Sequence, residues 1–163
     1  MKHAMKRNVI AVAALALAGC AAPAVPGAPG SDVLPPPAGL AETHWKAVEL
    51  GGVPVAPAEG DREPHLVLRA EPAPGMAEGL LPVQGGTGCN RLVGTYSATE
   101  RQLRFAPGAT TRMACPEPNP EPAFLKALAD TRAYRIGARH NDELELLDGA
   151  GRVVGRFRAT PQR

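Results

Sequence analysis

Short segments that alternate between apolar and polar residues recur along the chain from about residue 40 onward, and turn-forming residues separate them. A two-residue period places the apolar side chains on one face of a strand. Strands this short and this closely spaced are typical of antiparallel β proteins. The segments with this pattern are residues 45–50, 65–69, 79–84, 92–97, 102–105, 110–115, 132–137, 143–147 and 153–159. The sequence therefore predicts a mainly β domain.

One segment, residues 120–130, follows helical spacing instead. Asn119 is a suitable N-cap and Pro120 suits the first helical position. Phe124 and Leu128 lie one helical turn apart and belong on one face. A lone helix must bury that face against the sheet. We therefore expect an α+β fold that is mainly β: an antiparallel, strongly twisted sheet or partly closed barrel of short strands, with one packed helix over an opening.

The last two predicted strands indicate which face is buried. In the final strand, Val153 and Phe157 share a face that we expect to point inward. In the strand before it, Glu143 and Glu145 alternate with leucines. We expect these two carboxylates on the solvated side, because charged side chains are rarely buried without a partner.

The first 19 residues have the layout of a secretory signal peptide: a basic start, an apolar run over residues 9–17, and small residues before a cysteine. The run is well short of the roughly 20 residues that span a bilayer. The sequence Leu-Ala-Gly-Cys at residues 17–20 resembles the lipobox of bacterial lipoproteins. This resemblance implies that Cys20 is acylated and anchors the mature chain. An ordinary secreted protein with a chance cysteine is the alternative. Ala21, in place of an aspartate, favours the outer membrane, facing the periplasm.

The predicted organisation is a signal peptide over 1–19, a lipidated cysteine with a Pro/Ala/Gly-rich tether over 20–39, and one domain over 40–163. Six prolines in the tether disfavour helix and sheet there. Removal of the signal takes away Lys2, Lys6 and Arg7, which leaves 15 basic residues against 16 acidic ones. This near-neutral balance gives no indication of a nucleic-acid partner.

Three cysteines in an exported chain require an explanation for the odd one, and acylation of Cys20 supplies it. Cys89 lies in a glycine-rich turn, and Cys115 is the last residue of the predicted strand 110–115. The periplasm is oxidising, so we favour a disulfide between them. Two reduced thiols, a catalytic thiol, or a metal site that includes Met113 remain alternatives.

Several motifs in the domain resemble the META domain of the HslJ-like bacterial lipoproteins. They are Thr43 and Trp45, "GCN" ending at Asn90, Gly94 and Tyr96, Leu103 and Phe105, "TTRMAC" ending at Cys115, a helix with Phe124 and Leu128, and a late "LELLDGAGR". The resemblance covers about residues 40–159. It implies a small β-rich domain with a helix in the cell envelope, linked in some members to heat shock or novobiocin tolerance, without an established enzymatic activity. Long Pro-rich inserts at residues 53–64 and 71–75 depart from the family pattern.

The residues shared with the family suggest local roles. Trp45 and Tyr96 are expected to be core anchors with one polar atom paired each. Asn90 is expected to bond the local backbone in its turn, with a ligand contact as the alternative. Thr110, Thr111 and Arg112 are the candidates for an exposed binding site, and a solvated strand edge is the alternative.

The sequence lacks the common catalytic motifs, such as GxSxG, HExxH and a phosphate-binding glycine loop. The histidines at 44, 65 and 140 are scattered, without metal-ligand spacing. We therefore expect no catalytic residues, metal or cofactor.

The favoured function is a non-catalytic envelope lipoprotein that supports stress tolerance by binding another envelope component. The alternative is a periplasmic inhibitor of a hydrolase such as lysozyme or a protease, acting through residues 53–63 or the turn at 99–101. A pocket pairing His44 or His65 with a carboxylate would instead favour an enzyme.

Overall fold

All strand pairings in the described part of the chain are antiparallel, as the alternating sequence predicts. The computed structural model describes residues 39–58 and 60–160. The elements follow one another along the chain as β1 (His44–Leu50), β2 (Val53–Pro54), a short 3₁₀ turn (Gly60–Arg62), β3 (His65–Leu68), β4 (Leu81–Gly86), β5 (Arg91–Ala98), β6 (Leu103–Thr110), α1 (Glu121–Asp130), β7 (Ala133–Ile136), β8 (Glu143–Leu147) and β9 (Val153–Thr160).

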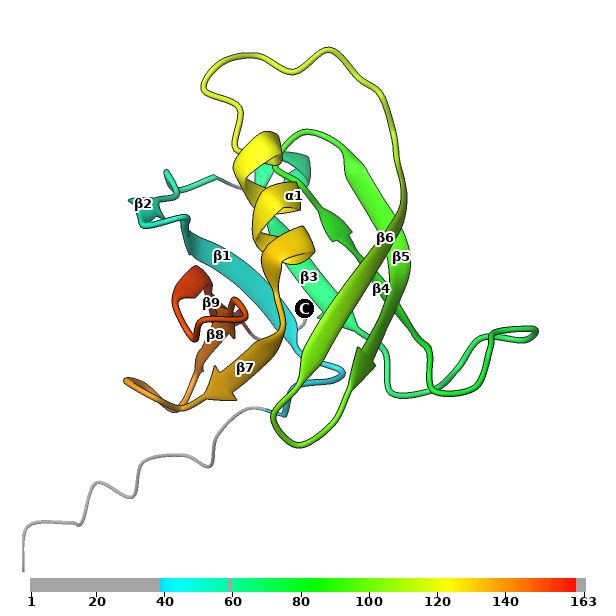
Figure 1. The fold of residues 1–163 in the computed structure, drawn as a ribbon. Helices are drawn as coiled ribbons and strands as arrows, with labels where there is room; N and C mark the ends of the chain where they lie inside the picture. Colours follow the sequence, from blue (N-terminus) through cyan, green and yellow to red (C-terminus); the bar gives the residue numbers. More distant parts are fainter. Residues whose placement is uncertain (1–38, 59, 161–163) are drawn as a thin grey trace, which may run out of the picture. The chain divides into compact units, whose positions relative to one another are not determined.

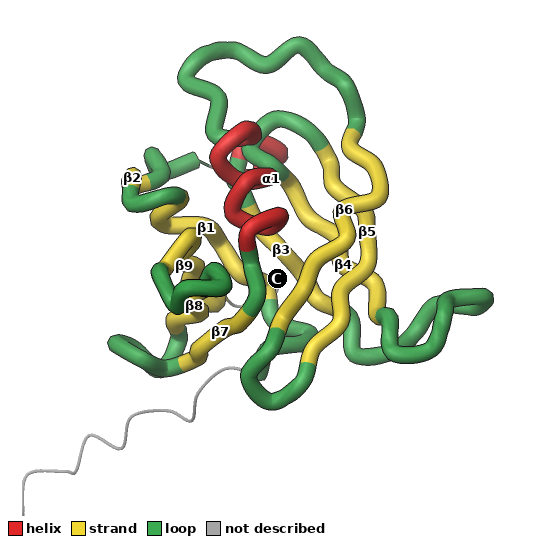
Figure 2. Tube along the Cα trace, in the orientation of Figure 1, coloured by secondary structure: helices red, strands yellow, loops and turns green. Residues whose placement is uncertain are grey.

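The strands form a nearly closed barrel with one helix (Figures 1 and 2). The order across the sheet is β6-β5-β4-β3-β1-β9-β8-β7, and β2 pairs with β1 off this path. The two ends of the sheet meet where Gln102 bridges Ala133 and the amide of Leu103 donates to the carbonyl of Arg132 at 3.2 Å. Closure of this kind leaves few backbone groups unpaired at the sheet edges. The predicted fold class is confirmed.

The apolar side chains that point inward from the strands form the core of the barrel, and the apolar face of α1 packs against this core. On one side the helix contacts β6, and on the other it contacts β1, β8 and β9. Phe124 is fully buried, and its ring meets the edge of Phe157 with the centroids 6.1 Å apart. The remaining large buried side chains are Trp45, Leu66, Leu68, Leu92, Tyr96, Leu103, Leu128, Leu144 and Leu146. The helix therefore covers an opening of the sheet.

Trp45 and Tyr96 are core anchors, as predicted. The indole N–H of Trp45 donates to the carbonyl of Leu40 at 2.9 Å. The hydroxyl of Tyr96 donates to the carbonyl of Arg69 at 2.7 Å. Each side chain thus fills the core while its polar group is satisfied.

Two predicted strands, 102–105 and 110–115, are wrong as separate elements. The structure has one strand, β6, which ends at Thr110, and residues 111–116 have no regular structure. The Pro-Gly pair at 107–108 does not end the strand, because the register shift between Val93 and Gly94 absorbs the irregularity. The next ladder bond, from Thr111 to the carbonyl of Arg91, is at the start of β5, so the chain beyond it has no strand to pair with.

The helix begins one residue later than predicted. α1 starts at Glu121, with Pro120 at the N-cap. Asn119 lies just outside, and its side-chain oxygen accepts the amide of Glu121 at 3.1 Å. A polar side chain therefore satisfies the first helical N–H, although from a position outside the standard cap.

The prediction that Glu143 and Glu145 are solvated is wrong. Their exposed fractions are 5% and 3%. Arginines from the neighbouring strands cover the outer face of β8: Arg135 of β7 contacts Glu145 at 2.8 Å, and Arg156 of β9 contacts it at 3.2 Å. The final strand follows its prediction, with Gly155 and Phe157 buried.

The predicted signal peptide, Cys20 and the tether up to residue 38 lie outside the described residues. Within the described residues, no helix has the length and apolar character needed to cross a bilayer.

Candidate functional site

The disulfide joins the glycine turn after β4 to the segment that leads from β6 to α1. Cys89 and Cys115 are bonded, with their Cα atoms 5.7 Å apart, within the usual range of about 4.4–6.8 Å. Gly88, directly before Cys89, has a φ of 97°. A Cβ at this position would collide with the ring of Pro120. Glycine is therefore required both for the turn and for the close approach of the helix N-terminus.

Asn90 is the hub of this end of the barrel, and it is only 3% exposed. Its side-chain oxygen accepts the hydroxyl of Thr111 at 2.9 Å and the amide of Met113 at 2.8 Å. Its side-chain nitrogen donates to the carboxylate of Glu121 at 2.9 Å and to the sulfur of Cys115 at 3.4 Å. Both donors and both acceptor positions of the amide are thus used within the protein. Asn90 holds the turn, the loop and the helix together.

Thr87 completes the same network. It is fully buried, and its hydroxyl contacts the carboxylate of Glu121 and accepts the amide of Asn90 at 3.0 Å. The amide of Thr87 in turn donates to the carbonyl of Asn90 at 2.8 Å. Glu121 sits in the first turn of α1, where the helix dipole favours a negative charge. The turn and the helix are therefore tied through one carboxylate.

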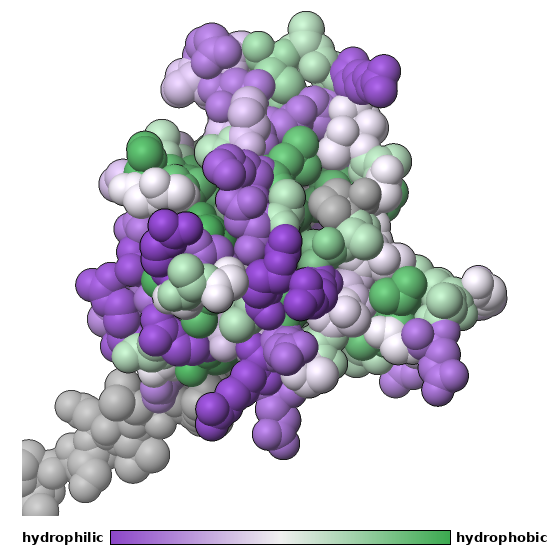
Figure 3. All heavy atoms as spheres, viewed as in Figure 1, coloured by the Kyte–Doolittle hydropathy of each residue, from purple (hydrophilic) through white to green (hydrophobic). Residues whose placement is uncertain are grey.

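The other predicted binding residues differ in how much they present to solvent. Thr110 is half-buried at the end of β6, where it pairs with Leu92. Thr111 is exposed, but its hydroxyl bonds both Asn90 and the amide of Arg91. Arg112 is exposed, and Met113 next to it is 58% exposed. We call residues 111–120 the disulfide loop; it arches over the helix end of the barrel and mixes hydrophilic and apolar side chains (Figures 1 and 3).

A second group of polar side chains lies on the outer face of β1 and β3. Trp45 and Leu66 point inward, so the period of two turns His44 and His65 outward. The two imidazole rings are stacked, with centroids 4.5 Å apart and planes 17° apart. They are diagonal neighbours across the strand pair, a position from which aromatic side chains meet.

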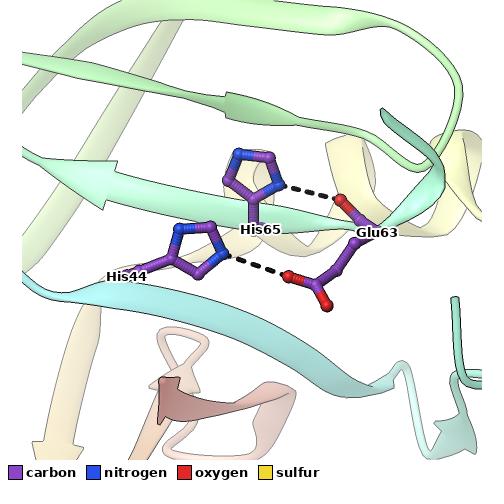
Figure 4. A group of neighbouring side chains, drawn as sticks. All are labelled: His44, Glu63 and His65. Carbon is purple, nitrogen blue, oxygen red and sulfur yellow. Dashed lines mark hydrogen bonds and ion pairs between the residues drawn. The ribbon is translucent and has the colours of Figure 1, made fainter. Parts of the chain in front are cut away.

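Glu63, two residues before the start of β3, faces both rings (Figure 4). Its carboxylate lies 3.1 Å from Nε2 of His44, and its main-chain oxygen lies 2.8 Å from Nδ1 of His65. The second carboxylate oxygen is 2.5 Å from the ammonium of Lys46. All of these side chains are partly buried. One ligand atom from each of His44, Glu63 and His65 lies within 4.8 Å of the others. We call these three residues the histidine–glutamate cluster.

The electrostatics of the cluster centre on Glu63. Burial alone would raise the pKa of Glu63, but the hydrogen bonds from Lys46 and His44 outweigh it and hold the pKa below its usual range. The carboxylate is therefore ionised at neutral pH and available as a ligand or an ion-pair partner.

Glycine in β4 makes room for the cluster. Gly86 pairs with His65, and a Cβ at Gly86 would approach the imidazole to 3.0 Å and the Glu63 carbonyl to 3.2 Å. Such spacing is tighter than ordinary van der Waals contact. The glycine thus lets the ring of His65 lie against the carbonyl of Glu63.

Sequence reasoning did not bring the two histidines together. His44 opens β1 and His65 opens β3, and each lies on the polar side of a two-residue alternation. That shared position is a signal, but it identifies a cluster only once β1 and β3 are known to be neighbours. His140 is exposed, in the turn between β7 and β8, and is not one of the three residues.

The comparisons with known proteins agree with this fold. The family model of the META domain matches residues 38–161. Among solved structures, an NMR structure of a protein from Burkholderia xenovorans is similar, with a TM-score of 0.55 and 24% identity over 85% of this chain and 100% of that chain. At this identity the likeness shows the fold alone. No curated protein matches the chain. Because the match spans nearly the whole barrel, this chain belongs to the META domain family.

Proposed function

We propose that this chain is a non-catalytic lipoprotein of the cell envelope, anchored through Cys20 to the outer membrane, that supports stress tolerance by binding another envelope component. The lipobox-like sequence at residues 17–20 supports the anchor, and the Pro-rich tether supports a domain held away from the membrane. The presence of a META domain supports a location in the cell envelope.

The observation that carries the binding proposal is the disulfide loop. The bond between Cys89 and Cys115 and the hydrogen bonds of Asn90 tie the loop to the barrel, while Arg112 and Met113 remain exposed on it. A loop held in place before binding loses little conformational entropy when a partner docks. Arginine and methionine are both enriched at protein interfaces.

The test is complementation of a deletion strain under heat, detergent and novobiocin. We expect the deletion to raise sensitivity and the unaltered chain to restore tolerance. The double variant Arg112→Ala/Met113→Ala should accumulate normally but fail to restore it, and Cys20→Ser should fail because the chain leaves the membrane. Arg139→Ala is the matched control: Arg139 is exposed in the turn that joins β7 to β8. That turn lies away from the disulfide loop (Figure 1). Normal sensitivity of the deletion strain would rule the proposal out.

A second candidate, inhibition of an envelope hydrolase, is favoured by residues 53–63. Two hydrogen bonds hold residues 53–58: the amide of Val55 donates to the carbonyl of Val48 at 2.9 Å, and Lys46 donates to the carbonyl of Ala58 at 3.3 Å. Val53 is 67% exposed. A segment held in this way loses less conformational entropy when it enters a cleft. Assays of the purified chain against lysozymes and periplasmic proteases decide the matter, and absence of inhibition at micromolar concentration removes this candidate.

A further inference from the structure

The donor atoms of the histidine–glutamate cluster are those of a transition-metal site. Two imidazoles and a carboxylate form the protein ligand set of several zinc enzymes, with further positions left to solvent. Imidazole nitrogen favours zinc, copper and nickel over calcium and magnesium, which prefer oxygen ligands. We propose that His44, Glu63 and His65 bind a divalent transition-metal ion, with Zn²⁺ as the reference ion, on the outer face of β1 and β3.

The ligand atoms lie close enough to share one ion once the imidazole rings rotate. Ligands at about 2.0–2.2 Å from a tetrahedral zinc ion lie roughly 3.4 Å from one another. The three ligand atoms already lie within 4.8 Å of each other, and the carboxylate of Glu63 is 3.1 Å from His44. An ion lies in the plane of each imidazole that binds it, and the two ring planes are only 17° apart, so at least one ring must rotate out of the stack to share the ion. Gly86 leaves space beside the His65 ring, where a Cβ would approach the imidazole to 3.0 Å.

Proton positions change when the ion binds. In the metal-free protein, Nε2 of His44 and Nδ1 of His65 both face oxygen atoms of Glu63 and act as donors. For these nitrogens to bind an ion, the proton of each neutral ring moves to its other nitrogen, and two hydrogen bonds are exchanged for metal bonds. No redox change and no further reactant are involved.

Lys46 is a competitor built into the site. Its ammonium lies 2.5 Å from the Glu63 carboxylate and neutralises it in the metal-free protein. A divalent ion on Glu63 must displace or repel this charge. Lys46 also donates to the carbonyl of Ala58, so it has a second partner when the carboxylate is taken. This arrangement predicts that removing Lys46 tightens metal binding, an effect that chance coordination by surface histidines elsewhere on the chain does not produce.

The experiment is titration of the purified full chain, without a polyhistidine tag and freed of metal with a chelator, with Zn²⁺ in a calorimeter. We expect one ion per chain and a weakening of at least 10-fold in His44→Ala and in His65→Ala. Lys46→Met should bind about 10-fold more tightly, the effect of one like charge removed at close range. His140→Ala, which removes an exposed histidine outside the cluster, should bind as the unaltered chain does.

Nuclear magnetic resonance of the unaltered chain tests the site without a variant. Zn²⁺ should shift the imidazole signals of His44 and His65 together and leave those of His140 in place. Absence of saturable binding, binding that persists unchanged in both histidine variants, or shifts confined to His140 would each overturn the proposal. Both experiments measure only the binding of the metal ion. Their outcome therefore does not depend on whether the chain supports stress tolerance.

Discussion

At the scale of single residues, Asn90 shows why one side chain cannot be exchanged for a similar one. Its amide offers two donors and two acceptor positions, and Thr111, Met113, Glu121 and Cys115 use all four. An aspartate of the same shape has no donor for the Glu121 carboxylate and would place two negative charges together. The buried position makes each lost bond costly, because no water replaces it.

We predict that Asn90→Ala lowers the free energy of unfolding by about 2–4 kcal/mol, because several buried partners lose their bonds at once. Asn90→Asp should be at least as damaging. Asn119→Ala is the matched control: its side chain accepts one amide at the start of α1, and about 1 kcal/mol or less is expected. Denaturant unfolding measures all three. A loss for Asn90→Ala no larger than that of the control would show that the network contributes little.

At the scale of elements, α1 and β8 depend on what surrounds them. The helix has ten residues, too few to be stable alone in water, so its stability comes from the apolar face that it buries in the barrel. Strand β8 is buried on both faces: leucines point inward, and on the other face arginines of β7 and β9 contact Glu145. The stability of α1 and the burial of β8 therefore depend on contacts with the rest of the barrel as well as on their own residues.

We predict that Phe124→Ala lowers the free energy of unfolding by about 3–5 kcal/mol, because it leaves a cavity between the helix and Phe157. Lys126→Ala, two residues along the same helix, removes an exposed pair with Asp130 and should cost at most about 0.5 kcal/mol. Thermal or denaturant unfolding, followed by circular dichroism, compares the two. Equal losses would mean that the helix does not complete the core.

At the scale of the whole molecule, three carboxyl groups respond to pH in a common direction. The pKa of Glu42 is lowered first by the main-chain N–H of Ala70. The pKa of Asp148 is lowered first by the main-chain N–H of Arg152. Together with Glu63, these carboxyl groups bind protons less readily in the folded chain than in the unfolded one. Their stabilising contribution is therefore present above the ordinary carboxyl pKa, 4.5 for the glutamates and 3.8 for the aspartate, and is lost as the pH falls through the lower folded values.

We predict that the free energy of unfolding falls as the pH is lowered from about 5 to about 3. Glu63→Gln should flatten part of this fall, by about 1 kcal/mol or less, because the group is partly exposed to solvent.

At alkaline pH the free energy of unfolding changes in the opposite direction and falls as the pH rises. Burial raises the pKa of Tyr96, so its contribution is complete below the ordinary value of 10 and is lost at higher pH. Denaturant titrations across this range measure both limbs, and a curve that is flat in acid would contradict the assignment.

The sequence by itself determined the features that depend on local chemistry. Alternation predicted most strands to within two residues, and proline and apolar spacing predicted α1. The cysteine count, with the expectation of export, favoured the pair at 89 and 115, which the structure joins. Each of these rests on a period, a turn or a covalent rule that a short segment carries alone. The core roles of Trp45 and Tyr96 were predicted as well, because large aromatic side chains seldom stay outside a small domain.

Only the tertiary structure decided which strands are neighbours. It places β9, the last strand, beside β1, the first, and puts β3 on the other side of β1. This arrangement brings His44 to His65 and covers Glu145 with Arg156, contacts between residues that are far apart along the chain. The alternation of a strand tells which side chains share a face, but the burial and the partners of an outer face depend on the adjacent strand. The histidine–glutamate cluster and the buried carboxylates of β8 therefore became visible only once the barrel was assembled.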